Sequence, residues 1–448
     1  MKKIFRTILY VLGLGALIRL GKRFLFLNTV APGAVGLAAK QLCSLVYVCG
    51  LEPEMARTRY IDPLIAALDI PISVKYDDTR RRVTATSYGM WSATAEMRDG
   101  LGATLITKID KDTHLAAVKL PAVSDKPLQR ATPEKYGKTF DPEAVETALD
   151  QAFLPEHHTL AVAVLHGGKL VTERYADGIG PTTSLPGWSM AKSVTATLVG
   201  LLVQQGRLDM NQPGIVPDWR GANDGREQVT LNHLLRMTSG LDLTEDQSGA
   251  DPNTRLLFVE PDAAAFAASR GLKAPPGTHW EYMSGSTVLA CRAIYHATGG
   301  TLESSQRFYQ DAFFSPLGAT SFVLEPDAAG TFIGSSYALA TARDWAKFGQ
   351  LYLQDGIWEG QRLLPKGWRD YVTQYTPQSG ANSYGAGFWT LEHSELAGLP
   401  RDTFYANGFQ GQYVIVVPSR SLVLVRLGAS LGPDGIWQLL GDIISAMN

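Results

Sequence analysis

The chain predicts an α+β fold in which one antiparallel sheet has helices packed against it. Three observations lead to this prediction. Short β-branched segments occur at 160–176 and again near the end, at 385–428. The residues between them follow mainly helical patterns and loops. No internal repeat of fixed period is present, so a repeat architecture is not expected.

Length and composition are those of an ordinary globular protein. The 448 residues are 45% hydrophobic and 19% charged, which is enough to bury a core without disulfides or metal. The net charge of −2 gives no overall attraction to nucleic acid, so no nucleic-acid partner is expected. Three cysteines are too few for a disulfide framework, although Cys43 and Cys49 could pair. The histidines and cysteines lack metal-ligand spacing, so we expect no metal and no other cofactor.

The amino-terminal segment is basic and apolar. The first 51 residues carry no acidic side chain, and residues 7–18 are mostly apolar with basic residues on both sides. This run is shorter than the ~20 residues that span a bilayer, and it also suits a signal or transit peptide. Because Arg and Lys stems can snorkel, residues 4–28 could instead form an uncleaved anchor. We expect residues 1–28 to be a membrane anchor or signal segment, with the protein on the cell-envelope side.

Residues 29–139 read as a small β-rich N-terminal region followed by a linker. Segments 72–78, 81–89 and 103–109 are short, β-branched and partly alternating, and 114–120 continues this character. Residues 121–139 are polar and contain three prolines, as a linker would. Asp141 and Pro142 then suit the N-cap and first turn of a helix. The main domain is therefore expected at 140–448.

Within this domain the strands and helices follow in a clear order. Two strands are expected at 160–176, around the Gly167-Gly168 turn. A long helix is expected to begin near Ser189 and to stop at Gly206, because apolar residues recur at helical spacing between them. Within 385–428, consecutive strands are expected at 385–392, 412–418 and 421–428, and a last helix is expected at 435–448.

Ser189 and Lys192 are candidates for a nucleophile and its base. Three positions apart at the first turn of a helix, their side chains share one face. A serine hydroxyl becomes a nucleophile when a neighbouring base takes its proton, and a lysine among apolar residues can be that base. The helix N-terminus would also stabilise a developing oxyanion. Ser-x-x-Lys also arises by chance, in which case Ser189 is only an N-cap and Lys192 a surface residue.

Two segments further along the chain strengthen the functional interpretation of Ser189 and Lys192. Ser189-Met190-Ala191-Lys192 is followed by Tyr282-Met283-Ser284 and then by Ala406-Asn407-Gly408. In this order they resemble the motifs Ser-x-x-Lys, Tyr-x-Asn or Tyr-x-Ser, and Lys-Thr-Gly of the serine β-lactamase and penicillin-binding-protein superfamily. The likeness spans roughly residues 145–448 and points to the class C-like branch, which includes esterases and 6-aminohexanoate-dimer hydrolases.

The resemblance implies a β-lactamase-like fold with an all-helical subdomain. It also implies hydrolysis of an amide or ester bond, in a small molecule or short peptide, through an acyl-enzyme on Ser189. Lys192 would be the base and Tyr282 the proton relay, and the oxyanion hole would use the N–H groups of Ser189 and of Phe409 or a close neighbour. Further candidates for contact with substrate are the motif neighbours Trp188, Ser284, Asn407, Gly408, Phe409, Gln410 and Gly411.

The third motif departs from the family pattern at Ala406. A typical penicillin-recognising enzyme has Lys or His there, and this cation would hold a substrate carboxylate. We therefore expect weak or no turnover of penicillins.

Two other interpretations remain open. A non-catalytic penicillin-binding-like fold could bind peptides or envelope components, which the absence of the motif lysine permits. An α/β-hydrolase esterase is less favoured, because residues 187–191 are one glycine short of Gly-x-Ser-x-Gly and follow a loop rather than a buried strand. Its late histidine would have to be His393. No feature of the sequence predicts an oligomeric state.

Overall fold

The computed structural model describes residues 2–66, 68–106, 118, 122–246, 248–394, 396 and 398–448. Side-chain surroundings are described for residue 19 and from residue 21 onward. The strand-like segment expected at 114–120 lies outside the described residues except for Val118, which belongs to no helix or strand.

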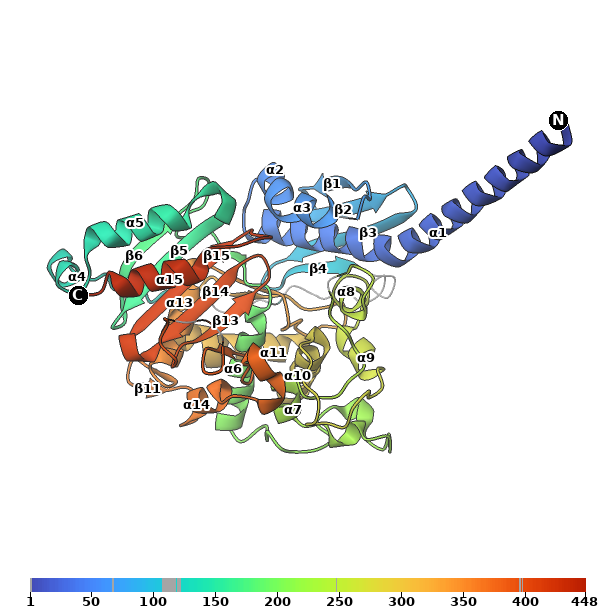
Figure 1. Ribbon diagram of the computed structural model, residues 1–448. Coiled ribbons are helices and arrows are strands. Elements are labelled where there is room, and N and C mark those ends of the chain that lie inside the picture. The colour runs from blue at the N-terminus through green and yellow to red at the C-terminus, as the bar shows by residue number, and fades with distance from the viewer. Residues whose placement is uncertain are drawn as a thin grey trace.

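A six-stranded antiparallel sheet, ordered β12-β13-β14-β15-β5-β6, forms the centre of the molecule (Figure 1). In this order its strands are Trp389–Thr390, Phe404–Gly408, Gln412–Val417, Leu422–Gly428, Thr159–His166 and Lys169–Tyr175. The early strand β5 pairs with the late strand β15, so segments far apart in sequence share one sheet. This confirms the predicted antiparallel sheet.

Helices cover both faces of the sheet, because alternate side chains of its strands are apolar on each face. On one face α5 (Pro142–Ala152) packs beside α15 (Ile436–Ser445), over Val162 and Ile415. On the other face α13 (Ala342–Leu353) and α6 (Met190–Gln204) pack against Val414 and its neighbours. The sheet is thus buried on both sides, and α6 lies along β13.

A largely helical region lies between α6 and the late strands, as expected for the helical subdomain. α10 (Ser284–Ala297) is its central helix and packs against α6, α7 and α9. Its other helices are α7 (Leu231–Leu235), α8 (Pro252–Phe258), α9 (Ala263–Ala268), α11 (Leu302–Tyr309) and α12 (Ser315–Leu317). Smaller elements follow: β8 (Val323–Leu324), β9 (Ala338–Ala340), β10 (Ile357–Trp358), β11 (Gln361–Arg362) and α14 (Trp368–Thr373).

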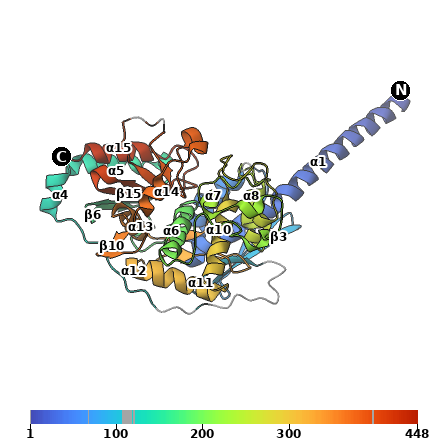
Figure 2. The same cartoon turned by 90° about the horizontal axis from the view of Figure 1, so that it is seen from below.

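The N-terminal region combines one long helix with a second sheet. α1 (Lys2–Cys43) projects from the body over its first half and is buried over its second half (Figures 1 and 2). The four-stranded antiparallel sheet contains β1 (Ser73–Asp77), β2 (Arg82–Ser87), β3 (Trp91–Arg98) and β4 (Gly102–Ile106). Two short helices, α2 (Pro53–Ala56) and α3 (Asp62–Ala66), precede it. The apolar N-terminal helix and the β-rich region agree with the predicted fold.

Three local features differ from the expectations or extend them. β3 was not expected, because its small and polar side chains do not alternate clearly. Residues 133–139 of the expected linker form a helix, α4 (Pro133–Thr139), because Thr132 caps it by accepting a hydrogen bond from Lys135 N at 3.3 Å. Cys43 and Cys49 do not pair: both are buried and free.

The second half of α1 is a core helix. In the described part of the chain, Gly21–Val48 is the one helical segment long and apolar enough to cross a membrane, but 78% of its most apolar window is buried in protein. Gly36 shows how closely it packs, because a Cβ there would lie 1.9 Å from the carbonyl oxygen of Phe258 in α8. Residues 30–43 of α1 are therefore packed against the rest of the protein.

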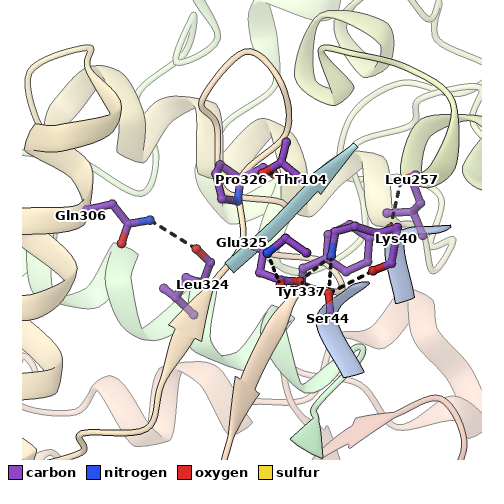
Figure 3. A network of polar contacts seen from close by, with 10 residues as sticks. Lys40, Ser44, Thr104, Leu257, Gln306, Leu324, Glu325, Pro326 and Tyr337 are labelled. Carbon is purple, nitrogen blue, oxygen red and sulfur yellow. Dashed lines mark hydrogen bonds and ion pairs between the residues drawn. The ribbon is translucent and has the colours of Figure 1, made fainter. Parts of the chain in front are cut away.

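A buried ion pair ties α1 to the main domain (Figure 3). Lys40 Nζ contacts Glu325 Oε2, and both side chains are 1% exposed. Glu325 also accepts hydrogen bonds from Ser44 Oγ at 3.0 Å and from the N–H of Ala103 in β4 at 2.7 Å. Lys40 Nζ lies 3.9 Å from the centre of the Tyr337 ring. One carboxylate thus holds α1, β4 and the segment after β8 together.

Candidate active site

A tight turn leads from β7 (Leu185–Pro186) into α6. The N–H of Gly187 donates to the carbonyl of Ala338 in β9 at 2.8 Å, which extends the pairing of these strands. A Cβ at position 187 would lie 2.4 Å from the ring of Trp345, so glycine is required there. Trp188 then adopts a left-handed φ of +46°, a strained conformation for a bulky residue. The turn delivers Ser189 to the N-cap of α6.

Ser189 and Lys192 face each other at the start of α6. Lys192 Nζ donates to Ser189 Oγ at 3.1 Å and to the carbonyl of Ser335 at 3.1 Å. Lys192 is only 2% exposed, because α6 is apolar on nearly every side and is buried along its length. Burial lowers the pKa of Lys192, since the ammonium loses its hydration. The Ser189 side chain makes no helix-capping hydrogen bond, so a simple capping role is not seen.

Tyr282 lies beside this pair, two residues before α10. Lys192 Nζ is 4.6 Å from the centre of the Tyr282 ring, and the Ser189 hydroxyl partly offsets the effect of burial on the pKa of Tyr282. Burial raises the pKa of Tyr282 well above its usual range, so the phenol keeps its proton at neutral pH. Tyr384 and Trp389 pack on its ring, with ring centres 6.0 Å and 5.4 Å away.

Glu245 is a site residue that sequence reasoning missed. Its Oε2 accepts hydrogen bonds from the N–H of Ser284 at 2.7 Å and from the Ser284 hydroxyl at 2.9 Å. Ser284 Oγ in turn lies 3.5 Å from Lys192 Nζ. The Glu245 carboxylate favours the ammonium form and so opposes the effect of burial on the pKa of Lys192. A lone acid in a loop has no motif spacing to Ser189, so no sequence signal marks it.

The third predicted motif lies at the end of β13, against the turn before α6. A Cβ at Gly408 would lie 2.1 Å from the carbonyl oxygen of Gly187, so the two backbones are in contact. Ala406 is fully buried. Asn407 uses its side chain locally, donating to the carbonyl of Gln412 at 3.3 Å.

The β13–β14 turn connects the site with the N-terminal region. Gln410 and Gly411 form this turn with φ of +61° and +78°. Gln410 Oε1 accepts a hydrogen bond from Trp188 Nε1 at 3.1 Å, and its Nε2 donates to the carbonyl of Tyr60 at 3.2 Å. The ring of Phe409 meets Trp188 edge-on, at 5.5 Å between ring centres. Gln410 is 3% exposed, so it braces Trp188 rather than facing open space.

The structure thus brings Ser189, Lys192, Tyr282 and Ser284 together, with Gly408 and Phe409 alongside. In the described part of the chain, neither the N–H of Ser189 nor that of Phe409 donates a hydrogen bond to another protein group. Among the same residues, no group of three or more His, Cys, Asp or Glu side chains is arranged to hold a metal ion.

Comparisons with known proteins identify the family. The Beta-lactamase family model matches residues 149–441. A 6-aminohexanoate-dimer hydrolase of Paenarthrobacter ureafaciens is 25% identical over 337 residues, which cover 70% of this chain and 84% of that one. A family VIII carboxylesterase structure has a TM-score of 0.55 at 18% identity, covering 69% of this chain and 98% of its own. A penicillin-binding protein homologue from Caulobacter crescentus has a TM-score of 0.52 at 19% identity, covering 68% and 97%. Because the family model spans well over half of the sequence, the chain belongs to the beta-lactamase family of serine hydrolases.

Proposed function

We propose that this protein cleaves an amide or ester bond through an acyl-enzyme on Ser189. One observation carries the proposal: the Ser189 hydroxyl lies 3.1 Å from the amine of a lysine that is 2% exposed. An amine whose pKa is lowered by burial is neutral more often, and only the neutral form can take a proton from serine.

In the proposed acylation, Ser189 Oγ attacks the substrate carbonyl carbon and passes its proton to Lys192 Nζ. The carbonyl oxygen becomes an oxyanion, which the free N–H groups of Ser189 and Phe409 would stabilise. The oxyanion then collapses and the bond to the leaving amine or alkoxide breaks. Tyr282 donates its proton to the leaving group and regains one from Lys192. Deacylation repeats these transfers in reverse order, with water as the nucleophile.

The opposite pKa shifts of Lys192 and Tyr282 support these roles. Burial favours a neutral amine at Lys192 and a protonated phenol at Tyr282. The first is the form that a base needs and the second is the form that a proton donor needs. Lys192 Nζ lies 3.1 Å from Ser189 Oγ and 4.6 Å from the centre of the Tyr282 ring, which supports proton exchange among these three side chains.

The proposed substrate is a small molecule or short peptide with an apolar portion near the bond that is cleaved. The relatives' names include a hydrolase of 6-aminohexanoate dimers and a carboxylesterase, which supports an amide or an ester. The half-buried rings of Tyr282 and Trp389 pack together beside the nucleophile, and the buried ring of Tyr384 supports both. Ala406 adds no cation to hold a carboxylate, so we propose weak or no turnover of penicillins.

We further propose that the N-terminal half of α1 anchors the enzyme to a membrane, on the cell-envelope side. Its sequence is apolar between basic residues, and the helix extends away from the body rather than packing on it. Assays of hydrolysis therefore require the full-length protein in mild detergent.

Labelling of the full-length protein tests the catalytic proposal. A fluorophosphonate probe should form one adduct on Ser189, located by intact mass and peptide mapping, and a penicillin should form little or none. Ser189→Ala should lose the adduct and lower ester or amide turnover on the order of 10⁴-fold, with an unchanged melting temperature. Ser193→Ala, one turn along the same helix, is the matched control and should still be labelled. An adduct on another serine, or none on Ser189, would overturn the proposal.

A further inference from the structure

Exposed apolar side chains gather where α1 leaves the body. Among the described residues six large hydrophobic side chains are exposed, and five of them lie either on α1 just before it is buried or in the β2–β3 turn. The two groups touch, because the Trp91 ring lies 6.3 Å from Phe24 and 6.4 Å from Tyr88. We name this surface the apolar collar; it consists of Phe24, Leu25, Phe26, Tyr88, Met90 and Trp91.

Positive charge accompanies the collar. Arg19 and Lys22 are exposed, with no carboxylate within ion-pair distance among the described residues. Arg23 pairs with Asp69 and also lies 5.5 Å from the centre of the Phe26 ring. Aromatic side chains beside Arg and Lys are the combination that favours the headgroup layer of an anionic membrane.

The length of α1 places the collar in the headgroup layer when residues 4–20 cross the hydrocarbon core. Residues 4–20 of α1 rise about 25 Å, which approaches the ~30 Å thickness of the hydrocarbon core. Phe24 then lies about 6 Å beyond the core, within the headgroup layer, because each helical residue adds ~1.5 Å. Figures 1 and 2 both show α1 leaving the body beside the N-terminal sheet, so the β2–β3 turn can reach the same depth.

We propose that the apolar collar is a membrane-docking surface that seats the enzyme on the headgroups of an anionic bilayer. The proposal rests on membrane anchoring by the N-terminal half of α1 and adds a second contact, made by the N-terminal sheet. A single helix would leave the body free to tilt. Two contacts fix its orientation, because the second half of α1 is rigidly packed in the body.

Site-specific labelling in a bilayer tests this proposal. The three native cysteines are buried, so Met90→Cys can carry the fluorophore NBD in the full-length protein. The protein is reconstituted in nanodiscs of phosphatidylethanolamine and phosphatidylglycerol, with and without a lipid that bears a nitroxide on its headgroup. Leu431→Cys is the matched control, since Leu431 is 48% and Met90 62% exposed, and Leu431 belongs to the loop after β15 rather than to the collar. Gly13→Cys reports on the helix anchor itself.

The proposal predicts at least twofold stronger quenching at position 90 than at position 431, with a blue-shifted NBD spectrum at position 90 only. Equal quenching at the two positions would overturn it. A blue shift at position 90 that depends on protein concentration without lipid would also overturn it, since the collar would then bind a second copy. A quencher dissolved in water gives a further comparison. If NBD is protected from it at position 13 but not at position 90, the membrane anchor is retained and the docking surface is rejected. Hydrolysis by the Met90→Cys protein is measured separately, so a failure of the catalytic proposal is recognised independently.

Discussion

At the scale of single residues, Lys192 receives two opposing influences. Burial disfavours its charged form, whereas the Glu245 carboxylate, reached through Ser284, favours it. Burial is the larger effect, so the pKa of Lys192 is lowered. In the proposed mechanism this balance keeps the amine available as a base, and Ser284 Oγ lies 3.5 Å from it.

The pH dependence of turnover should therefore follow Lys192. As pH rises, the ammonium loses its proton and kcat/KM should increase, with an apparent pKa below the ordinary lysine value of 10.5. Lys192→Arg keeps the charge but removes the base, so we expect a loss of about 10²–10⁴-fold at every pH. Steady-state kinetics between pH 5 and 10 measure this, with circular dichroism as the check on folding. An arginine variant that retains the wild-type profile would exclude Lys192 as the base.

Glu245→Gln should separate the charge of this residue from its hydrogen bonds. The amide oxygen can still accept from Ser284, but the negative charge that favours the ammonium is gone. The pKa of Lys192 should fall further, so the acidic limb of kcat/KM should move to lower pH. Glu245→Ala also removes the acceptor and should lower kcat as well. An acidic limb that stays in place or moves to higher pH in Glu245→Gln would contradict this role.

Motif spacing selects the candidate catalytic residues but not the groups that contact them. Ser189, Lys192 and Tyr282 were selected because each belongs to a motif and the motifs follow in order. Glu245 was not selected because it belongs to no motif. Its contact with Ser284 depends on the path of the loop that carries it. The sequence placed Gln410 with substrate-contacting residues, whereas its amide bonds to Trp188 and Tyr60.

At the scale of elements, the buried half of α1 is held by close packing of small residues and shows no helical periodicity of apolar residues. This half is rich in Ala, Gly and Val and contains Pro32, so it carries no clear amphipathic pattern. Small residues instead let α8 approach the helix backbone. α6 could be predicted because larger apolar residues recur along it and Gly206 follows it. β13 was harder to predict, because Asn407 and Gly408 are poor strand formers that pairing with β14 holds in place.

Gly36→Ala should destabilise the protein, although alanine is the better helix former. The added Cβ would lie 1.9 Å from the carbonyl of Phe258, so α1 and α8 must separate. We expect a loss of about 1–3 kcal/mol in the free energy of unfolding. Gly441→Ala in α15 is the matched control, because no atom lies within 4 Å of its added Cβ; it should gain about 0.5–1 kcal/mol. Urea unfolding measures both, and an unchanged Gly36→Ala variant would argue against the close contact.

At the scale of the whole molecule, the N-terminal region and the catalytic domain share one core. A single cluster of buried apolar side chains runs from α1 and the N-terminal sheet to α6 and α13. Two polar connections reinforce it: Lys40 with Glu325, and Gln410 with the carbonyl of Tyr60. The second connection also braces Trp188, so the N-terminal region supports the turn that presents Ser189.

Lys40→Met tests whether the two parts unfold as one unit. The substitution leaves Glu325 charged, buried and without its cation, which should cost about 3–5 kcal/mol of unfolding free energy. Adding Glu325→Gln removes the stranded charge while keeping an acceptor for Ser44 and Ala103, so the double variant should recover most of that loss. Because the core is shared, hydrolysis and tryptophan fluorescence should be lost together within each variant, although the urea midpoint itself should differ between variants. Activity that persists after the fluorescence transition of Lys40→Met would mean that the catalytic domain folds without its N-terminal partner.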